Sequence, residues 1–390
     1  GRYFTGRLDL AKGKTEEAIE LFQGVIKDEP QSAPAHQYLG LAFAQKNDLS
    51  RARQELGEAV KAASNLPDVH TQLAAIHLTE GSNDLAIEEA QTALRQNQRD
   101  VKAATILGDA YLRKGDLAKG KETYEVIAKA LPNAPFFLYR LGLIARAEKN
   151  DAKALTYFED ALKQNPNFLD PLVQIASIKQ TQNKSKDARE RVTKQLEAAP
   201  NNPMLYNLLG RLWLAEKNSG EAEKAYKKAI DINSALPVSY MNLAQLYIGS
   251  NRLDEAIKEY EVALEKNPKL LPARVLLGVI YEHRKELDKA KSQYLEALKI
   301  DPKFAPAANN LAWIMSEQGD NIDQALTYAQ TAREQRPEDP NIADTIGWIY
   351  YKKNAYLKAV SFLKEAAEKL GDNPMVLYHY GMALAKNGDK

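Results

Sequence analysis

The chain of 390 residues carries 53 Lys and Arg against 52 Asp and Glu, a formal net charge of +1, and no cysteine. The balanced charge argues against a nucleic-acid binder, which usually has a clear basic excess, and the missing cysteines exclude disulfides, thiolate metal sites and cysteine nucleophiles. No apolar run approaches the roughly 18 residues that a spanning helix needs, so we expect no direct membrane span. These features leave the compartment open; we slightly favour an extracytoplasmic location over the cytoplasm.

A period of 34 residues runs along the chain. A Leu-Gly or Leu-Ala pair recurs from Leu39-Gly40 to Leu311-Ala312, with Ile175-Ala176 in one slot. One extra residue enters between Met315 and Ala325, and the register resumes at Ile346-Gly347. The period predicts one continuous array over 1–390, with units at about 1–32, 33–66, 67–100, 101–134, 135–168, 169–202, 203–236, 237–270, 271–304, 305–339, 340–373 and a partial unit at 374–390.

Each unit has the pattern of two short amphipathic helices joined by a polar turn. Twelve residues beyond the Gly or Ala lies a second small residue, with Gly120 the only non-alanine among eleven. A bulky residue such as Tyr226 follows it, and a proline such as Pro268 ends many units. Small residues allow two helix backbones to approach, and proline cannot continue a helix. One hairpin cannot bury its apolar face alone, so we expect stacked hairpins with a continuous core.

One unit contains Tyr240, Leu243, Ala244, Tyr247, Ala256, Tyr260, Ala263 and Pro268. This pattern resembles the tetratricopeptide repeat, and the resemblance covers the whole chain. It implies an all-α fold, a right-handed superhelical solenoid of antiparallel helix pairs with about eleven and a half repeats. It also implies a protein or peptide segment as partner, no cofactor and no catalytic residues. Self-association through the uncapped ends stays open.

Two irregularities stand out in this array. The unit around Leu172–Pro200 has Lys179, Val192 and Gln195 where aromatic residues or alanine are usual, so we expect it to pack less tightly. The last unit has only its first helix, which suggests a fragment of a longer array or of a multidomain protein.

Other motifs have simpler explanations. The segment Gly115–Glu122 is close to a phosphate-binding loop, but it ends in Glu where a hydroxyl is needed and no strand precedes it. His36, His70 and His77 lack further nearby ligands, so we interpret them as packing residues and expect no metal site. Asn183-Lys184-Ser185 fits a glycosylation sequon in a turn, a triplet that is common by chance.

In the family that the chain resembles, the first helix of each unit lines the concave face. We number each repeat so that the Leu-Gly pair fills positions 7 and 8. Trp313 and Trp348 then share the ninth position of neighbouring repeats, outside the consensus core, whereas Trp213 falls on a core position. Tryptophan, tyrosine and arginine often dominate binding energy. We therefore predict a partner site on the concave face, richest near the C-terminus: Tyr139, Arg146, Asn207, Arg211, Asn309, Trp313, Asp344, Trp348, Tyr351, Tyr378 and Met382. The alternative is that the two tryptophans only fill space between helices.

Two functions remain after these exclusions. The first is a non-enzymatic scaffold of a bacterial envelope or secretion-type assembly, because the stretches at 310–314, 344–351 and 378–385 resemble repeats of exopolysaccharide-export and surface-protein-sorting systems. The second is a regulatory or substrate-recruiting region of a larger enzyme whose catalytic domain lies outside this segment. No unit has Asn at its ninth position, which disfavours the family's mode of binding chaperone tails.

Overall fold

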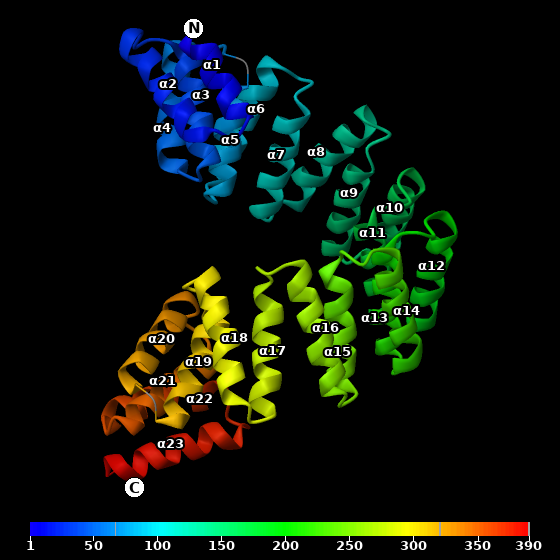
Figure 1. Ribbon diagram of the computed structural model, residues 1–390. Coiled ribbons are helices and arrows are strands. Elements are labelled where there is room, and N and C mark those ends of the chain that lie inside the picture. The colour runs from blue at the N-terminus through cyan, green and yellow to red at the C-terminus, as the bar shows by residue number, and fades with distance from the viewer. Residues whose placement is uncertain (67, 320, 389–390) are drawn as a thin grey trace. The chain divides into compact units, whose positions relative to one another are not determined.

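The computed structural model describes residues 1–66, 68–319 and 321–388, and these ranges form helices joined by short turns, with no strand among them (Figure 1). Within these ranges the helices are α1 (Arg2–Ala11), α2 (Thr15–Asp28), α3 (Ala33–Gln45), α4 (Leu49–Ala62), α5 (Val69–Thr79), α6 (Asn83–Gln96), α7 (Val101–Arg113), α8 (Leu117–Ala130), α9 (Pro135–Ala147), α10 (Asp151–Gln164), α11 (Leu169–Thr181), α12 (Ser185–Ala198), α13 (Pro203–Ala215), α14 (Ser219–Ile232), α15 (Pro237–Gly249), α16 (Leu253–Lys266), α17 (Leu271–His283), α18 (Leu287–Ile300), α19 (Ala305–Gln318), α20 (Ile322–Gln335), α21 (Pro340–Lys352), α22 (Tyr356–Lys369) and α23 (Pro374–Asn387).

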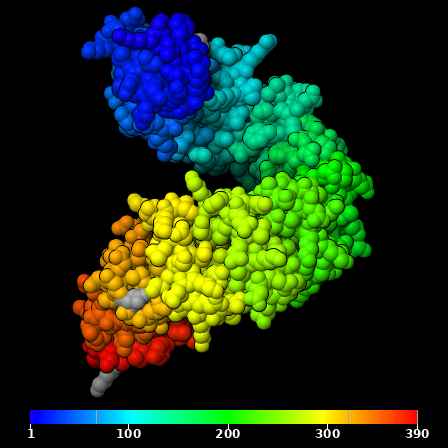
Figure 2. All heavy atoms as spheres, viewed as in Figure 1, coloured from blue at the N-terminus to red at the C-terminus, as the bar shows by residue number. Residues whose placement is uncertain are grey.

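The chain divides into two compact units, Gly1–Ala188 and Arg189–Lys390. In each unit, helices that are consecutive in the chain pack as pairs, such as α9 with α10 in the first unit and α15 with α16 in the second. Neighbouring pairs also contact one another within each unit, as α10 does α11 in the first and α14 does α15 in the second. First helices of neighbouring pairs touch as well, as α19 does α21. The space-filling view shows the pairs of the second unit closely packed along its visible face (Figure 2). The predicted all-α solenoid of helix pairs is confirmed, whereas the single array and its repeat limits stay predictions.

The turn inside each pair repeats one backbone conformation. A residue with positive φ ends the first helix at 13, 47, 81, 115, 149, 183, 217, 251, 285 and 319, and after the one-residue insertion at 354. Glycine and asparagine fill most of these positions because they tolerate the left-handed region best. Three of the positions hold lysine, so the turn is kept even where the local residue disfavours it. The near match to a phosphate-binding loop is such a turn, since Gly115 has φ +85°.

The small residue at position 8 faces the bulky residue that lies 16 residues further along, on the second helix. A Cβ added to Gly108 would lie 2.7 Å from the ring of Tyr124, and one added to Gly278 would lie 2.5 Å from the ring of Tyr294. Both tyrosines are fully buried. Where position 8 holds Ala74, the opposing residue is Ala90, so the two sizes compensate. Close packing without voids requires this complementarity.

Three predicted features of the sequence have clear positions in the structure. His36 and His70 each pair with a glutamate of the following helix, with Nδ1 2.7 Å from Glu55 and 2.6 Å from Glu89. Val192 is fully buried although it is smaller than the aromatic residue usual in its slot. Trp213 is half-buried, with the guanidinium of Arg189 3.9 Å from its ring.

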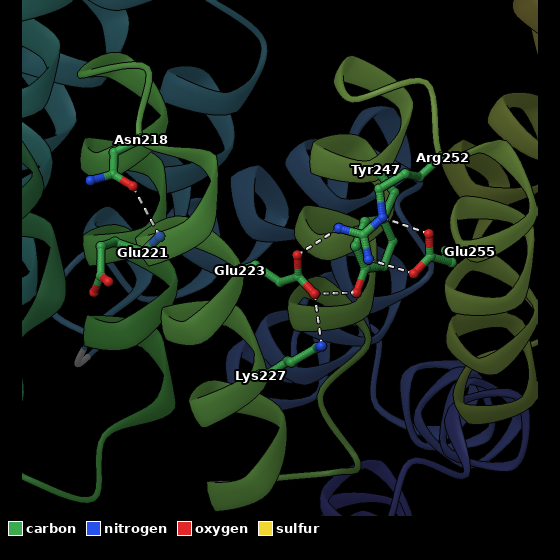
Figure 3. Close-up of polar contacts among 7 residues, drawn as sticks. All are labelled: Asn218, Glu221, Glu223, Lys227, Tyr247, Arg252 and Glu255. Atoms are coloured by element: carbon green, nitrogen blue, oxygen red, sulfur yellow. Dashed lines mark hydrogen bonds and ion pairs between the residues drawn. The ribbon is translucent and has the colours of Figure 1, made fainter.

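A charged network joins two successive pairs of the second unit (Figure 3). Glu223 on α14 accepts hydrogen bonds from Arg252 at 2.7 Å and from the Tyr247 hydroxyl at 3.0 Å, and Lys227 lies 2.7 Å away. Arg252 also bonds Glu255 at 2.5 Å. The bond from Arg252 is the main cause that lowers the pKa of Glu223 to about 2; burial opposes it, and bonds from Lys227 and Tyr247 add to it.

This network predicts an acid-dependent stability. Because the folded pKa of Glu223 lies below the unfolded value, its contribution is present above about pH 4.5 and is lost as the pH falls toward 2. Replacing Glu223→Gln should lower the free energy of unfolding by about 1 kcal/mol at pH 7, and this difference should shrink below pH 4.5. Urea unfolding midpoints of the wild type and of Glu223→Gln at pH 7 and pH 2.5 measure this difference in stability. Glu265→Gln is the control, because this carboxylate is exposed and forms no ion pair with the residues that the structure describes. An equal loss at both pH values would contradict the assignment.

Candidate partner-binding surface

The first helices of neighbouring repeats are linked by a recurring contact from position 5 of one repeat to position 6 of the next, 35 residues along. Gln37 and Gln72 are 3.3 Å apart, and Asn242 donates to Asn207 at 3.1 Å. The same pairing places His379 Nδ1 2.9 and 3.1 Å from the two carboxylate oxygens of Asp344. These contacts fix how each first helix sits beside the next, and so they position the side chains that project beyond them.

Three aromatic residues, Trp313 on α19, Trp348 on α21 and Tyr378 on α23, lie next to His379, and Tyr351 of α21 stacks on Trp348. We call Trp313, Trp348, Tyr351 and Tyr378 the aromatic surface. The Trp348 ring lies between two partners, stacked on Tyr351 at 4.8 Å and on His379 at 4.2 Å. Trp313 approaches the same imidazole at 5.6 Å. Both indoles are half-buried, so they pack on His379 and keep part of their surface exposed. Tyr378 is 56% exposed.

His379 is the residue that organises this surface, and the sequence analysis did not assign it a role. Its side chain is 2% exposed and is held by Asp344 beneath the two indoles. The sequence signal that could have found it is the spacing of 35 from Asp344, the same offset that links Asn207 to Asn242. His379 therefore contacts aromatic side chains from three successive repeats.

The edge of the aromatic surface carries a fixed charge pair. The Trp348 indole N–H donates to Glu317 at 2.8 Å, and the Lys352 ammonium lies 2.7 Å from the same carboxylate. Burial alone would raise the pKa of Glu317, but the bonds from Lys352 and Trp348 and the charges of Lys352 and His379 together lower it. Glu317 therefore stays ionised and fixes the rotation of the Trp348 ring.

A pocket of about 440 Å³ lies beside this surface, between the first helices α17, α19, α21 and α23. Asn309, Trp313 and Asp344, three of the residues predicted for the partner site, line it. Glu282, Asn310 and Arg336 line it as well, and sequence analysis did not single them out. The C-terminal residues of the predicted site thus share one region of the second unit; Met382 lies half-buried on α23.

The remaining predicted residues lie in other places. Asn207 is only 3% exposed. Its amide N–H donates to the Ser239 hydroxyl and its amide oxygen accepts from Asn242, so it links helices beneath the surface. Arg211, one turn further on α13, is exposed. Both belong to the second unit.

Tyr139 and Arg146 are on α9 of the first unit. Tyr139 packs on Phe158 and Phe168 with ring distances of 5.8 and 5.3 Å, and burial is the main cause that raises its pKa. Arg146 bonds Gln174 and, at 3.2 Å, Ser177 of α11. Within the second unit, the structure therefore brings together seven of the predicted residues, Asn309, Trp313, Asp344, Trp348, Tyr351, Tyr378 and Met382, whereas Asn207 and Arg211 lie on α13; Tyr139 and Arg146 belong to the first unit.

The residue ranges that the structure describes also bear on metal binding and membrane crossing. No group of three or more His, Asp or Glu side chains in these ranges could hold a metal ion. Among the helices of the same ranges, none combines the length and the apolar character that crossing a membrane requires.

Comparison with known proteins gives one family. Models described as tetratricopeptide repeat match residues 9–76, 71–135, 135–168, 173–237, 214–273, 271–304 and 293–327. The crystal structure of yeast Tom70 is similar with a TM-score of 0.53 at 14% identity, covering 99% of this chain and 95% of that one. This likeness concerns the fold alone.

Two curated relatives match part of the chain. The type IV pilus assembly protein PilF of Pseudomonas aeruginosa is 27% identical over 160 residues, which are 39% of this chain and 61% of that protein. The aspartyl/asparaginyl beta-hydroxylase of Mus musculus is 25% identical over 163 residues, again 39% of this chain but 22% of the enzyme. The chain thus spans about six-tenths of the first relative and about a fifth of the second.

Proposed function

Because this chain belongs to the tetratricopeptide-repeat family, we propose that it is a non-enzymatic scaffold that binds an extended protein segment on the aromatic surface. The observation that carries the proposal is the grouping of two half-buried tryptophans and an exposed tyrosine over one buried histidine. A rigid, partly exposed aromatic group loses little side-chain entropy on binding, and such residues often dominate interface energy.

Tyr378 offers a clean test because it is exposed and its loss leaves the core unchanged. Peptides selected from a displayed random library against the whole chain serve as the probe. Tyr378→Ala should weaken the selected peptides about tenfold, measured as Kd by calorimetry. Leu357→Ala removes a 75% exposed apolar side chain from a second helix of the same unit and should change nothing. Equal affinity of wild type and Tyr378→Ala would reject the aromatic surface as the site.

For the biological setting, we propose a bacterial envelope or secretion-type assembly. The partial similarity to a pilus assembly protein supports this choice over a general cytoplasmic role. Identifying proteins that are cross-linked to the chain in cells, with and without Trp348→Ala, would test it. A partner set without envelope components would count against it.

A recruiting region of a larger enzyme is the second candidate function. The match to about a fifth of a hydroxylase favours it, because the matched stretch accounts for only a small part of that enzyme. The encoding gene decides between the two: a catalytic domain in the same reading frame would support recruitment, and its absence would support the scaffold.

A further inference from the structure

The pocket beside the aromatic surface has an excess of negative charge. Three carboxylates line it, Glu282, Asp339 and Asp344, against one guanidinium, that of Arg336. Arg336 lies 4.0 Å from Asp339 and offsets part of its charge. Asp344 in turn faces the imidazole of His379.

Glu282 is the carboxylate whose charge has no cationic partner. The Tyr294 hydroxyl donates to its Oε1, and the structure records no ion pair for it among the described residues. Burial raises the pKa of Glu282, against the lowering effect of the Tyr294 bond. A carboxylate that is half-buried beside a pocket and lacks a counter-charge is stabilised when a cation enters.

Asn309 supplies an unused acceptor at the same wall. At the other position-5 contacts described above, the side chain pairs with position 6 of the next repeat. For Asn309 that residue is Thr345, whose hydroxyl instead donates to the backbone oxygen of Asn341 at 3.0 Å. The Oδ1 atom of Asn309 is consequently buried without a hydrogen-bond partner. A buried acceptor of this kind costs free energy until a donor reaches it.

The helix ends at the pocket give an anion little to bind. The first turns of α21 and α23 point their N–H groups toward this region, but Asp339 accepts from Asn341 N and Asn373 accepts from Met375 N, both at 3.0 Å. The wall formed by α17 and α19 instead presents the carboxylate of Glu282 and the indole of Trp313, a ring that attracts cations, beside the buried Oδ1 of Asn309, while Arg336 stands next to Asp339. The chemistry of the lining therefore selects a positively charged donor.

We propose that this pocket receives the cationic side chain, arginine or lysine, of the peptide segment that crosses the aromatic surface. The charged group is held by Glu282 and Asn309, and its aliphatic stem lies along Trp313. The inference rests on the proposed function, and it adds the chemistry of the segment: a basic residue flanked by positions that contact Trp348 and Tyr378.

Four capped pentapeptides that differ only at the central residue test this inference. The centre is arginine, lysine, citrulline or glutamate between alanines, and the whole chain is titrated while the indole N–H signals of Trp313 and Trp348 are followed by NMR. The arginine and lysine peptides should shift the Trp313 signal in a saturable way, at least about tenfold more tightly than citrulline or glutamate.

Two variants separate this inference from the proposed function. Glu282→Gln keeps an acceptor for Tyr294 and should abolish the preference for arginine over citrulline. Glu296→Gln removes an equal charge from the second helix α18, where Lys299 is its partner, and should leave the preference intact. If arginine and citrulline bind equally, or if no pentapeptide shifts Trp313, the cationic pocket is wrong. The Tyr378→Ala experiment then decides by itself whether the aromatic surface binds peptides.

Discussion

Replacing Trp313→Ala together with Trp348→Ala should weaken the library-selected peptides at least about 100-fold while the helical content stays unchanged. The reason is geometric. Trp348 is stacked between Tyr351 and His379, and Trp313 contacts the same histidine from the neighbouring repeat. Removing both rings takes away the contact area and also the support that holds Tyr351 and His379 in place, so the effect should exceed that of Tyr378→Ala. Calorimetry gives the Kd, and circular dichroism gives the helical content.

A third tryptophan provides the matched control. Trp213 is also half-buried, but it lies on α13 under the guanidinium of Arg189, away from the aromatic surface. Trp213→Ala should leave peptide affinity within about twofold, because additivity holds for sites without shared partners. If the double variant bound as wild type does, the tryptophans would serve only to fill space between helices, the alternative that the sequence leaves open.

Gly142→Ala should have the largest effect on stability, about 3 kcal/mol lost in the first unit. An added Cβ would meet the ring of Phe158 far inside van der Waals distance. Phe158 is fully buried and packs on Tyr139 at 5.8 Å, so its ring has no free space to move into. Either the pair α9 and α10 separates or the ring adopts a strained rotamer, and both destabilise the core. Urea unfolding followed by circular dichroism measures the loss.

The same change at a different glycine gives the opposite sign. Gly57 lies within α4, and a Cβ added there meets nothing within 4 Å. Gly57→Ala should stabilise the helix by about 0.5–1 kcal/mol, because alanine loses less backbone entropy than glycine. Combining Gly142→Ala with Phe158→Leu should lower the free energy of unfolding by less than the sum of the two single changes, because the smaller leucine leaves room for the added Cβ. An additive result would show that the predicted clash is not the cause.

The two glycines also show why sequence patterns predict some features of this fold and not others. The 34-residue period, the small residues at fixed offsets and the left-handed turn residues act within one helical hairpin, so they could be read along the chain. The same register assigned Asn309, Trp313, Asp344, Trp348, Tyr351, Tyr378 and Met382 to the concave face, and these residues lie in one region of the second unit. It also assigned Asn207 to that face, and in the structure this side chain is buried and hydrogen-bonded to Ser239 and Asn242 of the next repeat.

What the sequence alone determined is therefore the helical hairpin, its repetition and the family, because each depends on residue types at fixed spacings along the chain. Only the tertiary structure decided that His379 lies beneath both indoles, that Glu282 belongs to the same pocket as Asp344, and that Asn309 Oδ1 has no hydrogen-bond partner among the described residues. These facts depend on the offset between successive first helices. At Asn309, the residue at position 6 of the next repeat is Thr345, whose hydroxyl donates to the backbone oxygen of Asn341, so Asn309 Oδ1 has no hydrogen-bond partner among the described residues. Side-chain contacts between repeats depend on how successive first helices are placed in three dimensions, and residue types alone do not encode that placement.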